Sequence, residues 1–150
     1  MIDVNEFPAD APPPHIAALL AGAFDALRAE LNARTLPGLR PSHYRVMSLI
    51  PGGGLRLSEL AERAAITRAG IGQFMKYLEN LGYVALRPDP SDSRAKIVRL
   101  TPSGTSAVEL STAIIAETET RWEAALGAGR YRELRRSLQE IGRLAPPPAA

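Results

Sequence analysis

Residues 57–100 hold two short helical patterns that are followed at once by two β-prone runs. The first helix is predicted from Ser58 to Ala64. The second begins after Thr67, a residue type that suits an N-cap, and runs to about Leu81, before Gly82 ends it. Two short helices joined by a tight turn form a helix-turn-helix pattern, although any helical hairpin gives the same pattern.

The second predicted helix has two different faces. At about 100° per residue, one arc gathers its apolar side chains, namely Ile71, Phe74, Met75, Leu78 and Leu81. The opposite face holds small residues, amides and a lysine but no acid, namely Ala69, Gly72, Gln73, Lys76 and Asn80. Small residues permit close approach to another surface, and Gln and Lys side chains reach base edges or phosphates. This face therefore favours contact with a DNA groove over a merely solvated surface.

Two glycines weaken the same helix. Gly70 and Gly72 each cost roughly 1 kcal/mol of helix stability relative to alanine. Either tertiary packing tolerates both, or Gly72 leaves room for a DNA backbone or base edge. The sequence alone leaves these two interpretations open.

The two β-prone runs, Val84–Leu86 and Ile97–Leu100, flank the stretch RPDPSDSRAK. Prolines and aspartates interrupt strands, so we expect a hairpin with a long, exposed loop. Helix, helix and hairpin, in this order, form a winged helix. An arginine at the hairpin tip, Arg94, can enter a narrow and strongly negative minor groove, and Asp92 is expected to bind and orient its guanidinium. The alternative is an exposed Asp–Arg pair that contributes only ~0–1 kcal/mol.

The net charge of the whole chain is only +2, but its distribution is uneven. Between Arg56 and Arg99 eight basic residues stand against five acidic ones, so this part carries +3 and the rest of the chain −1. A basic middle suits a surface that binds phosphates. On charge alone, a solvated surface of mixed charge is an equally good interpretation.

The composition argues against several classes of function. The chain of 150 residues suits one compact domain, or one domain plus arms. Its lack of cysteine excludes disulfides, thiol redox sensing and cysteine-based zinc sites. It has only two histidines and no Ser–His–Asp spacing, phosphate-binding glycine loop or carboxylate pair on one helix face, so we expect no enzyme activity, metal or cofactor. No run approaches about eighteen apolar residues, and the acidic, proline-rich start is unlike a signal peptide. We therefore expect a cytoplasmic protein without membrane contact.

The two ends of the chain carry apolar stripes that have no partner within the winged helix. A helix from His15 to about Thr35 bears Ile16, Leu20, Ala23, Leu27 and Leu31. A second helix is predicted over Pro41–Ile50. A further helix starts at Thr101–Pro102 and breaks at Gly127–Gly129, and the last one bears Tyr131, Leu134, Leu138, Ile141 and Ala145. We expect the two end stripes to pack together and onto a second copy of the chain; an intramolecular bundle is the alternative.

From PSHYRVMSLI to RPDPSDSRAKIVRLTPSG, about 64 of the 150 residues, the chain resembles the MarR family of bacterial winged-helix transcriptional regulators. The most specific part is the hairpin, which follows that family's wing signature at Asp89–Pro90, Asp92, Arg94–Ala95–Lys96, Leu100–Thr101 and Gly104. The chain departs from the family pattern at Ala65, where glycine is common, and at Arg56, where a capping Ser or Thr is common. Gly70 and Gly72 also replace the more usual Ala or Ser.

The resemblance implies an obligate homodimer that binds palindromic DNA and is often released by a small ligand. It makes Arg94 the wing arginine, with Asp92 as its orienting partner, and places on the DNA side of the recognition helix Thr67, Arg68, Gln73 and Lys76. The outer face derived above adds Ala69 and Gly72. In the family the ligand pocket lies between the dimer helices and the winged helix, where the candidates are His43, Tyr44 and Trp122.

The expected fold is mostly α with a small β-hairpin: a winged helix-turn-helix flanked by N- and C-terminal dimerisation helices. Its expected parts are a disordered arm (1–14), dimerisation helices (15–40 and 102–145), the winged helix-turn-helix (41–101) and a tail (146–150). The expected function is a sequence-specific DNA-binding regulator, a ligand-responsive repressor acting as a homodimer on an inverted-repeat operator. Its partners would be double-stranded DNA, a second copy and a small aromatic or other organic ligand. The alternative is a winged-helix protein-interaction module without specific DNA binding.

Overall fold

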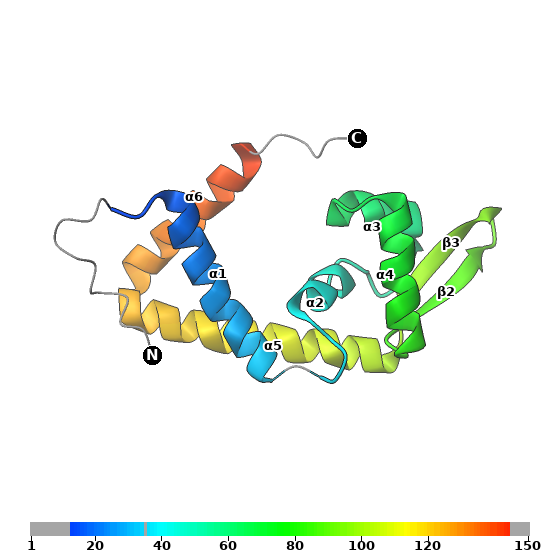
Figure 1. The fold of residues 1–150 in the computed structure, drawn as a ribbon, viewed down its shortest axis with the longest axis horizontal. Coiled ribbons are helices and arrows are strands. Elements are labelled where there is room, and N and C mark those ends of the chain that lie inside the picture. Colours follow the sequence, from blue (N-terminus) through cyan, green and yellow to red (C-terminus); the bar gives the residue numbers. More distant parts are fainter. Residues whose placement is uncertain (1–12, 35, 145–150) are drawn as a thin grey trace.

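The computed structural model describes residues 13–34 and 36–144. The predicted arm, apart from its last two residues, and the predicted tail lie outside this range. Six helices and three strands follow one another along the described residues (Figure 1): α1 (Ile16–Ala33), α2 (Pro41–Met47), β1 (Leu55–Arg56), α3 (Leu57–Ala64), α4 (Arg68–Asn80), β2 (Val84–Asp89), β3 (Asp92–Leu100), α5 (Pro102–Leu126) and α6 (Ala128–Leu144). The mostly helical winged-helix fold is confirmed.

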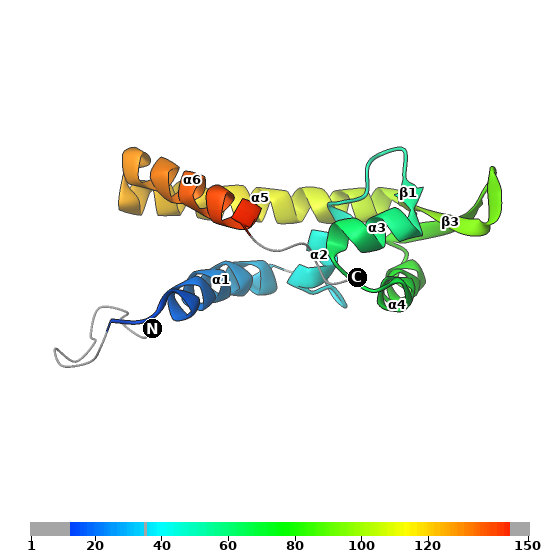
Figure 2. The ribbon, with the colours of Figure 1, turned by 90° about the horizontal axis from the view of Figure 1, so that it is seen from above.

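The long helix α5 runs along most of the length of the molecule, and the other elements lie beside it (Figures 1 and 2). The helices α2 to α4 and the hairpin gather near its N-terminal end, whereas α1 and α6 pack along the rest of it. Ion pairs Arg34–Glu117 and Arg121–Glu30 join α1 to α5, and the Tyr131 hydroxyl of α6 donates to Glu119 of α5 at 2.9 Å. Within one chain, the principal partner of both end helices is therefore α5.

The hydrophobic core lies in the winged-helix part. Its largest fully buried side chains come from α2, α3, α4 and the sheet: Val46, Met47, Leu60, Ile71, Met75, Leu78, Val84 and Val98. Ala107 of α5 is also fully buried there. The inward arc predicted for α4 is thus confirmed for Ile71, Met75 and Leu78. Leu81 was also expected inward but is 40% exposed, because α4 has already ended and Leu81 is its C-cap residue.

The three strands form an antiparallel sheet in the order β1-β3-β2. The predicted long loop is wrong, because both strands of the hairpin continue into the RPDPSDSRAK stretch and only Pro90 and Ser91 connect them. Pro88 pairs with Lys96 inside the ladder. It is tolerated because β2 is an edge strand, where a missing backbone donor faces away from the sheet.

Helix ends in the helix-turn-helix follow local rules. The Thr67 hydroxyl accepts from the Gly70 amide at 3.1 Å, so Thr67 is the predicted N-cap of α4, and Gly82 follows that helix with φ +78°. Ala65 closes α3 in the left-handed region with φ 54°, which costs a non-glycine residue roughly 1–2 kcal/mol. The strain predicted for this turn is therefore present.

The helices α1 and α2 are slightly shorter than predicted. α2 ends at Met47 and not Ile50, because the amides of Leu49 and Ile50 bond three residues back, to Val46 and Met47, and tighten the chain into a turn. Within the described ranges, no helix is long and apolar enough to cross a membrane.

Candidate nucleic-acid interface

The outer face of α4 is available to a partner. Arg68, Ala69, Gln73 and Lys76 are exposed, and Gly72 is partly exposed. Thr67 is exposed as well, but its hydroxyl is used in the helix cap. The one acid at the edge of this face, Glu79, accepts a hydrogen bond from the Leu86 amide at 2.9 Å and so ties α4 to β2. The face therefore offers donors and small side chains without a free carboxylate among them.

The two glycines of α4 have different surroundings. A Cβ on Gly70 would lie 3.0 Å from the Thr67 hydroxyl and 3.1 Å from a methyl of Ile66, so the N-cap explains this glycine. A Cβ on Gly72 would meet nothing within 4 Å. Packing inside the chain therefore gives no reason for Gly72, which sits on the outer face.

The wing tip is held by Asp92 through the main chain. Its Oδ1 accepts from the backbone amide of Arg94 at 3.0 Å. The expectation that Asp92 binds the guanidinium of Arg94 is wrong for this structure, because the short side chain folds onto the amide two residues ahead instead. The Arg94 side chain is left exposed and the backbone beneath it is constrained.

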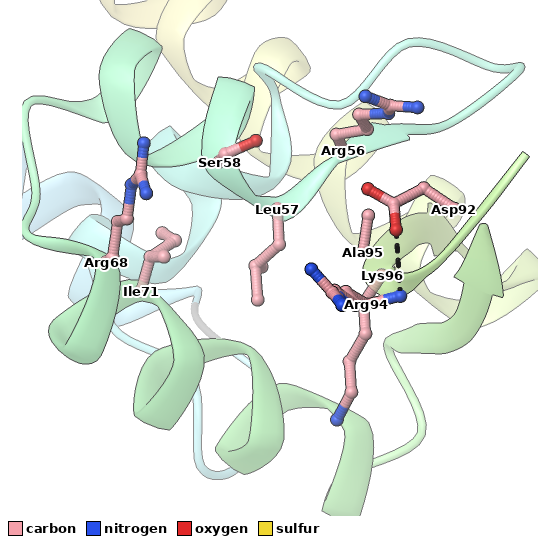
Figure 3. Close-up of a pocket in the computed structure, with 9 residues that line it drawn as sticks. All are labelled: Arg56, Leu57, Ser58, Arg68, Ile71, Asp92, Arg94, Ala95 and Lys96. Atoms are coloured by element: carbon pink, nitrogen blue, oxygen red, sulfur yellow. Dashed lines mark hydrogen bonds between the residues drawn. The ribbon is translucent and has the colours of Figure 1, made fainter.

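A groove of about 380 Å³ runs between the wing and the helix-turn-helix. Figure 3 shows Arg68 of α4 on one side, Arg94 and Lys96 of β3 on the other, and Leu57 between them. Arg56 lines the same groove. Four cationic side chains thus surround a space that also contains the carboxylate of Asp92, an arrangement that suits a polyanion.

Arg56 takes part in a network that the sequence did not reveal. Its Nε donates to Asp89 Oδ2 at 2.7 Å, and its Nη2 donates to the Ser91 hydroxyl at 3.1 Å. Asp89 Oδ1 accepts from both the amide and the hydroxyl of Ser91, at 2.8 and 2.7 Å. These bonds from Ser91, together with the Arg56 guanidinium, hold the pKa of Asp89 below its usual range. Arg56 is also the N-cap residue of α3, without a capping bond from its side chain.

Comparison with known proteins identifies the group to which these features belong. A model of the MarR family matches residues 38–95, which include the helix-turn-helix and most of the wing. Transcriptional regulator HosA of Escherichia coli O111:H- is 34% identical over 94 residues, which make up 58% of this chain and 70% of that protein. The chain belongs to the MarR family. It is thus a transcriptional regulator of a family whose members are generally not enzymes.

Solved structures of MarR-like fold cover most of the chain. The PcaV transcriptional regulator from Streptomyces coelicolor in complex with its natural ligand has a TM-score of 0.73 at 21% identity, over 91% of this chain and 98% of that one. The S. aureus MepR–DNA complex has a TM-score of 0.73 at 17% identity, over 88% of this chain and 99% of that one. At these identities, the two structures establish the fold of this MarR-family protein.

A second cleft, of about 900 Å³, lies between α1, α2 and α5 of this MarR-family protein. Tyr44 lines it, whereas the other two ligand candidates, His43 and Trp122, do not. Its walls are mainly apolar, with three arginines and one glutamate: Phe24, Leu27, Leu31, Ile115, Arg28, Arg40, Arg45 and Glu119. The cleft can therefore hold an apolar molecule that also carries a polar or anionic group.

His43 faces α4 instead. Its ring packs edge-on against Phe74, with centroids 4.9 Å apart, and lies 5.2 Å from the ring of Tyr77. Its Nδ1 accepts from the Arg40 amide at 3.0 Å and so caps α2. Burial, followed by the nearby charge of Arg40, lowers the pKa of His43. This histidine is a packing and capping residue between α2 and α4.

Proposed function

We propose that this MarR-family regulator binds double-stranded DNA in a sequence-specific manner, with α4 in the major groove and the wing over an adjacent minor groove. The supporting observation is the outer face of α4, free of unpaired acids, beside the groove lined by four cations. The residues proposed to contact DNA or to hold those contacts are Thr67, Arg68, Ala69, Gly72, Gln73, Lys76, Asp92 and Arg94. Arg94 would enter the minor groove, where arginine is favoured by the strongly negative potential.

The protein is further proposed to act as a homodimer through residues 15–40 and 102–145. On a single chain, apolar side chains of both end helices face solvent, among them Ile16, Leu19, Phe24, Leu138, Ile141 and Leu144. Soluble monomers rarely leave large apolar patches exposed, so these side chains support burial against a second copy. A two-fold dimer would read an inverted repeat whose half-sites lie about 10–10.5 base pairs apart.

The regulator is proposed to be a repressor that a small organic ligand releases from its operator. The mainly apolar cleft beside Tyr44, with arginines at its walls, supports an aromatic or other organic ligand carrying an anionic group. The PcaV structure was solved with its natural ligand, and MepR with DNA, which is consistent with both activities in one fold.

The competing function is a winged helix that binds proteins and not DNA. The two functions are distinguished by titrating labelled duplexes from the DNA that flanks the gene with the protein at several salt concentrations. A protein that contacts phosphates should bind the duplex with an affinity that falls steeply as the salt concentration rises. Arg94→Ala should weaken binding to an inverted repeat by about 1–3 kcal/mol per half-site without unfolding the protein. Arg132→Ala removes one positive charge from an exposed part of α6, outside the proposed DNA surface, and is the control: with sedimentation equal to that of the wild type, its DNA binding should be unchanged. If the wild-type protein binds none of these duplexes at low salt, the result would favour the protein-interaction module.

A further inference from the structure

The wing projects beyond the third strand that supports it. β1 pairs with β3 only at Leu55↔Val98 and Arg56↔Ile97. The hairpin extends beyond β1 to its tip (Figure 2), where Asp89 lies opposite Asp92. A two-stranded ribbon on its own is strongly twisted and marginally stable, so its tip needs another restraint if it is to keep one position.

The side chain of Arg56 supplies a contact beyond the last backbone pair. From the end of β1 it reaches two residues of the tip, Asp89 at 2.7 Å and Ser91 at 3.1 Å. Together with the two bonds from Ser91 to Asp89, these contacts form a closed network that we name the tip anchor: Arg56, Asp89 and Ser91. The network joins the start of α3 to the turn of the wing, over 33 residues of sequence.

The tip anchor differs from an ordinary surface ion pair. The side chain of Asp89 is only 7% exposed, and both of its oxygens are occupied. Leaving the buried Asp89 carboxylate without a donor would lower the stability of the fold, because water cannot replace the lost hydrogen bond. Exposed ion pairs, in contrast, contribute little to the stability of a protein. The register of the ladder also shifts between Pro88 and Asp89, which turns the backbone at the point where the anchor holds it.

We infer that Arg56 is a positioning residue of the wing: it fixes the turn at Asp89 and Ser91, and thereby the place from which Arg94 projects. Asp92 then restrains the backbone at Arg94, because its carboxylate accepts a hydrogen bond from the Arg94 amide. The inference rests on the proposed binding of DNA, because it assigns Arg56 a part in that binding. The arginine side chain has no hydrogen-bond acceptor and so cannot cap α3, and its donors hold the wing instead.

A direct phosphate contact from Arg56 is the competing role, since Arg56 also lines the cationic groove. Two of its donors are already occupied by the tip anchor, and the charge of Asp89 offsets that of its guanidinium. Neither condition applies to Arg68 or Lys96, which are exposed in the same groove. The contacts of Arg56 therefore favour a role in positioning the wing over a direct contact with a phosphate.

The first test needs no DNA and uses Arg56→Thr. A threonine at this N-cap, three residues before Glu59, would create a capping box, which offsets part of the stability lost with the Arg56–Asp89 pair, so the variant should remain folded. The NMR order parameters of the Ser91 and Arg94 amides should nevertheless fall from about 0.85 to below about 0.6. Arg87→Thr, on the same hairpin but outside the tip anchor, is the matched control. Unchanged order parameters in Arg56→Thr would overturn the inference, whether or not the protein binds DNA.

The second test measures binding to the operator duplex in a double-mutant cycle with Arg94→Ala. Arg56→Thr alone should weaken binding by at least about threefold per half-site, and by no more than Arg94→Ala does. In the Arg94→Ala background, Arg56→Thr should have no further effect, because positioning acts through the missing side chain. A full additional loss there, with a lower salt dependence, would show that Arg56 binds a phosphate itself. If wild-type protein binds no DNA, the proposed function fails while the order parameters still decide the role of the anchor.

Discussion

Replacing Gly72 with alanine should stabilise the free protein and weaken its binding to DNA. Gly72 lies inside α4, five residues after the N-cap Thr67, and a Cβ at this position would meet nothing within 4 Å. The added methyl group therefore causes no clash within the chain. Since glycine inside a helix is less stable than alanine by about 0.5–1 kcal/mol, the free energy of unfolding should rise by about this amount.

In the proposed complex the same methyl group lies between α4 and the DNA. A glycine on a face that enters the major groove allows the backbone to approach the bases closely, and one methyl group prevents this approach. Losing the fit at one base step typically costs about 1–3 kcal/mol, which is about 5- to 150-fold in affinity per half-site. Stability and DNA affinity should therefore change in opposite directions.

Thermal unfolding and fluorescence-anisotropy titration of the operator duplex measure the two effects. Gly70→Ala is the contrasting variant in the same helix, because its Cβ would press on the Thr67 cap and should lower stability. Gly52→Ala, in the turn before β1 with nothing within 4 Å of its Cβ, lies outside the proposed DNA and dimer surfaces and should leave DNA affinity unchanged. If Gly72→Ala binds the operator as tightly as wild type, the space at Gly72 is not used by DNA, and the glycine is merely tolerated.

Three other variants test packing, protonation and assembly. Gly104→Ala should lower the free energy of unfolding by about 3 kcal/mol or more, because its Cβ would lie 2.0 Å from the Tyr83 carbonyl oxygen. Chemical denaturation measures this free energy, and a loss no larger than that of an ordinary surface substitution would contradict the predicted clash. Because burial lowers the pKa of His43, the unfolded chain binds the proton more readily, so stability should decline as pH falls below about 6.5; His43→Gln should remove this part of a melting-temperature profile, and an unaltered profile would refute the cause. Leu138→Arg, on the exposed side of α6, should convert a dimer into a monomer in sedimentation, and an unchanged dimer would place the interface elsewhere.

Local signals in the sequence were sufficient for most helix ends. Thr67 caps α4, and Thr101 caps α5 by accepting from the Gly104 amide at 3.1 Å, as short-range rules predict. The outer face of α4 also follows from helical periodicity alone, because the residues that pack inward fix which residues face out. Such features depend on neighbours within one or two helical turns.

Features that depend on distant partners could not be predicted in this way. Pro88 and Asp89 look like strand breakers, but their place at a sheet edge, opposite β3, lets the strand continue. The two residues of β1 have no periodic signal and become a strand only by pairing with Ile97 and Val98. The role of Arg56 likewise needed a partner 33 residues away.

The ligand candidates show the limit of choosing neighbours in sequence. His43 and Tyr44 are adjacent in α2, and successive residues of a helix point about 100° apart. In the structure Tyr44 lines the cleft, while His43 packs against α4. Trp122 lies near the C-terminal end of α5 and does not line the cleft.

Three positions of the helix-turn-helix break local rules, and their distribution bears on function. Arg56 lacks a side-chain capping bond, Ala65 adopts a left-handed conformation, and Gly72 interrupts a helix without a packing reason, each at a cost of about 1 kcal/mol. Departures from local preference are expected where a surface serves a partner. Arg56 lines the cationic groove and Gly72 lies on the outer face of α4, so these two departures coincide with the proposed DNA surface; nothing in the structure explains Ala65. If the helix-turn-helix served only for packing, a capping residue at position 56 and an alanine at position 72 would make it more stable. Arg56 and Gly72 at these positions therefore support a surface that serves a partner.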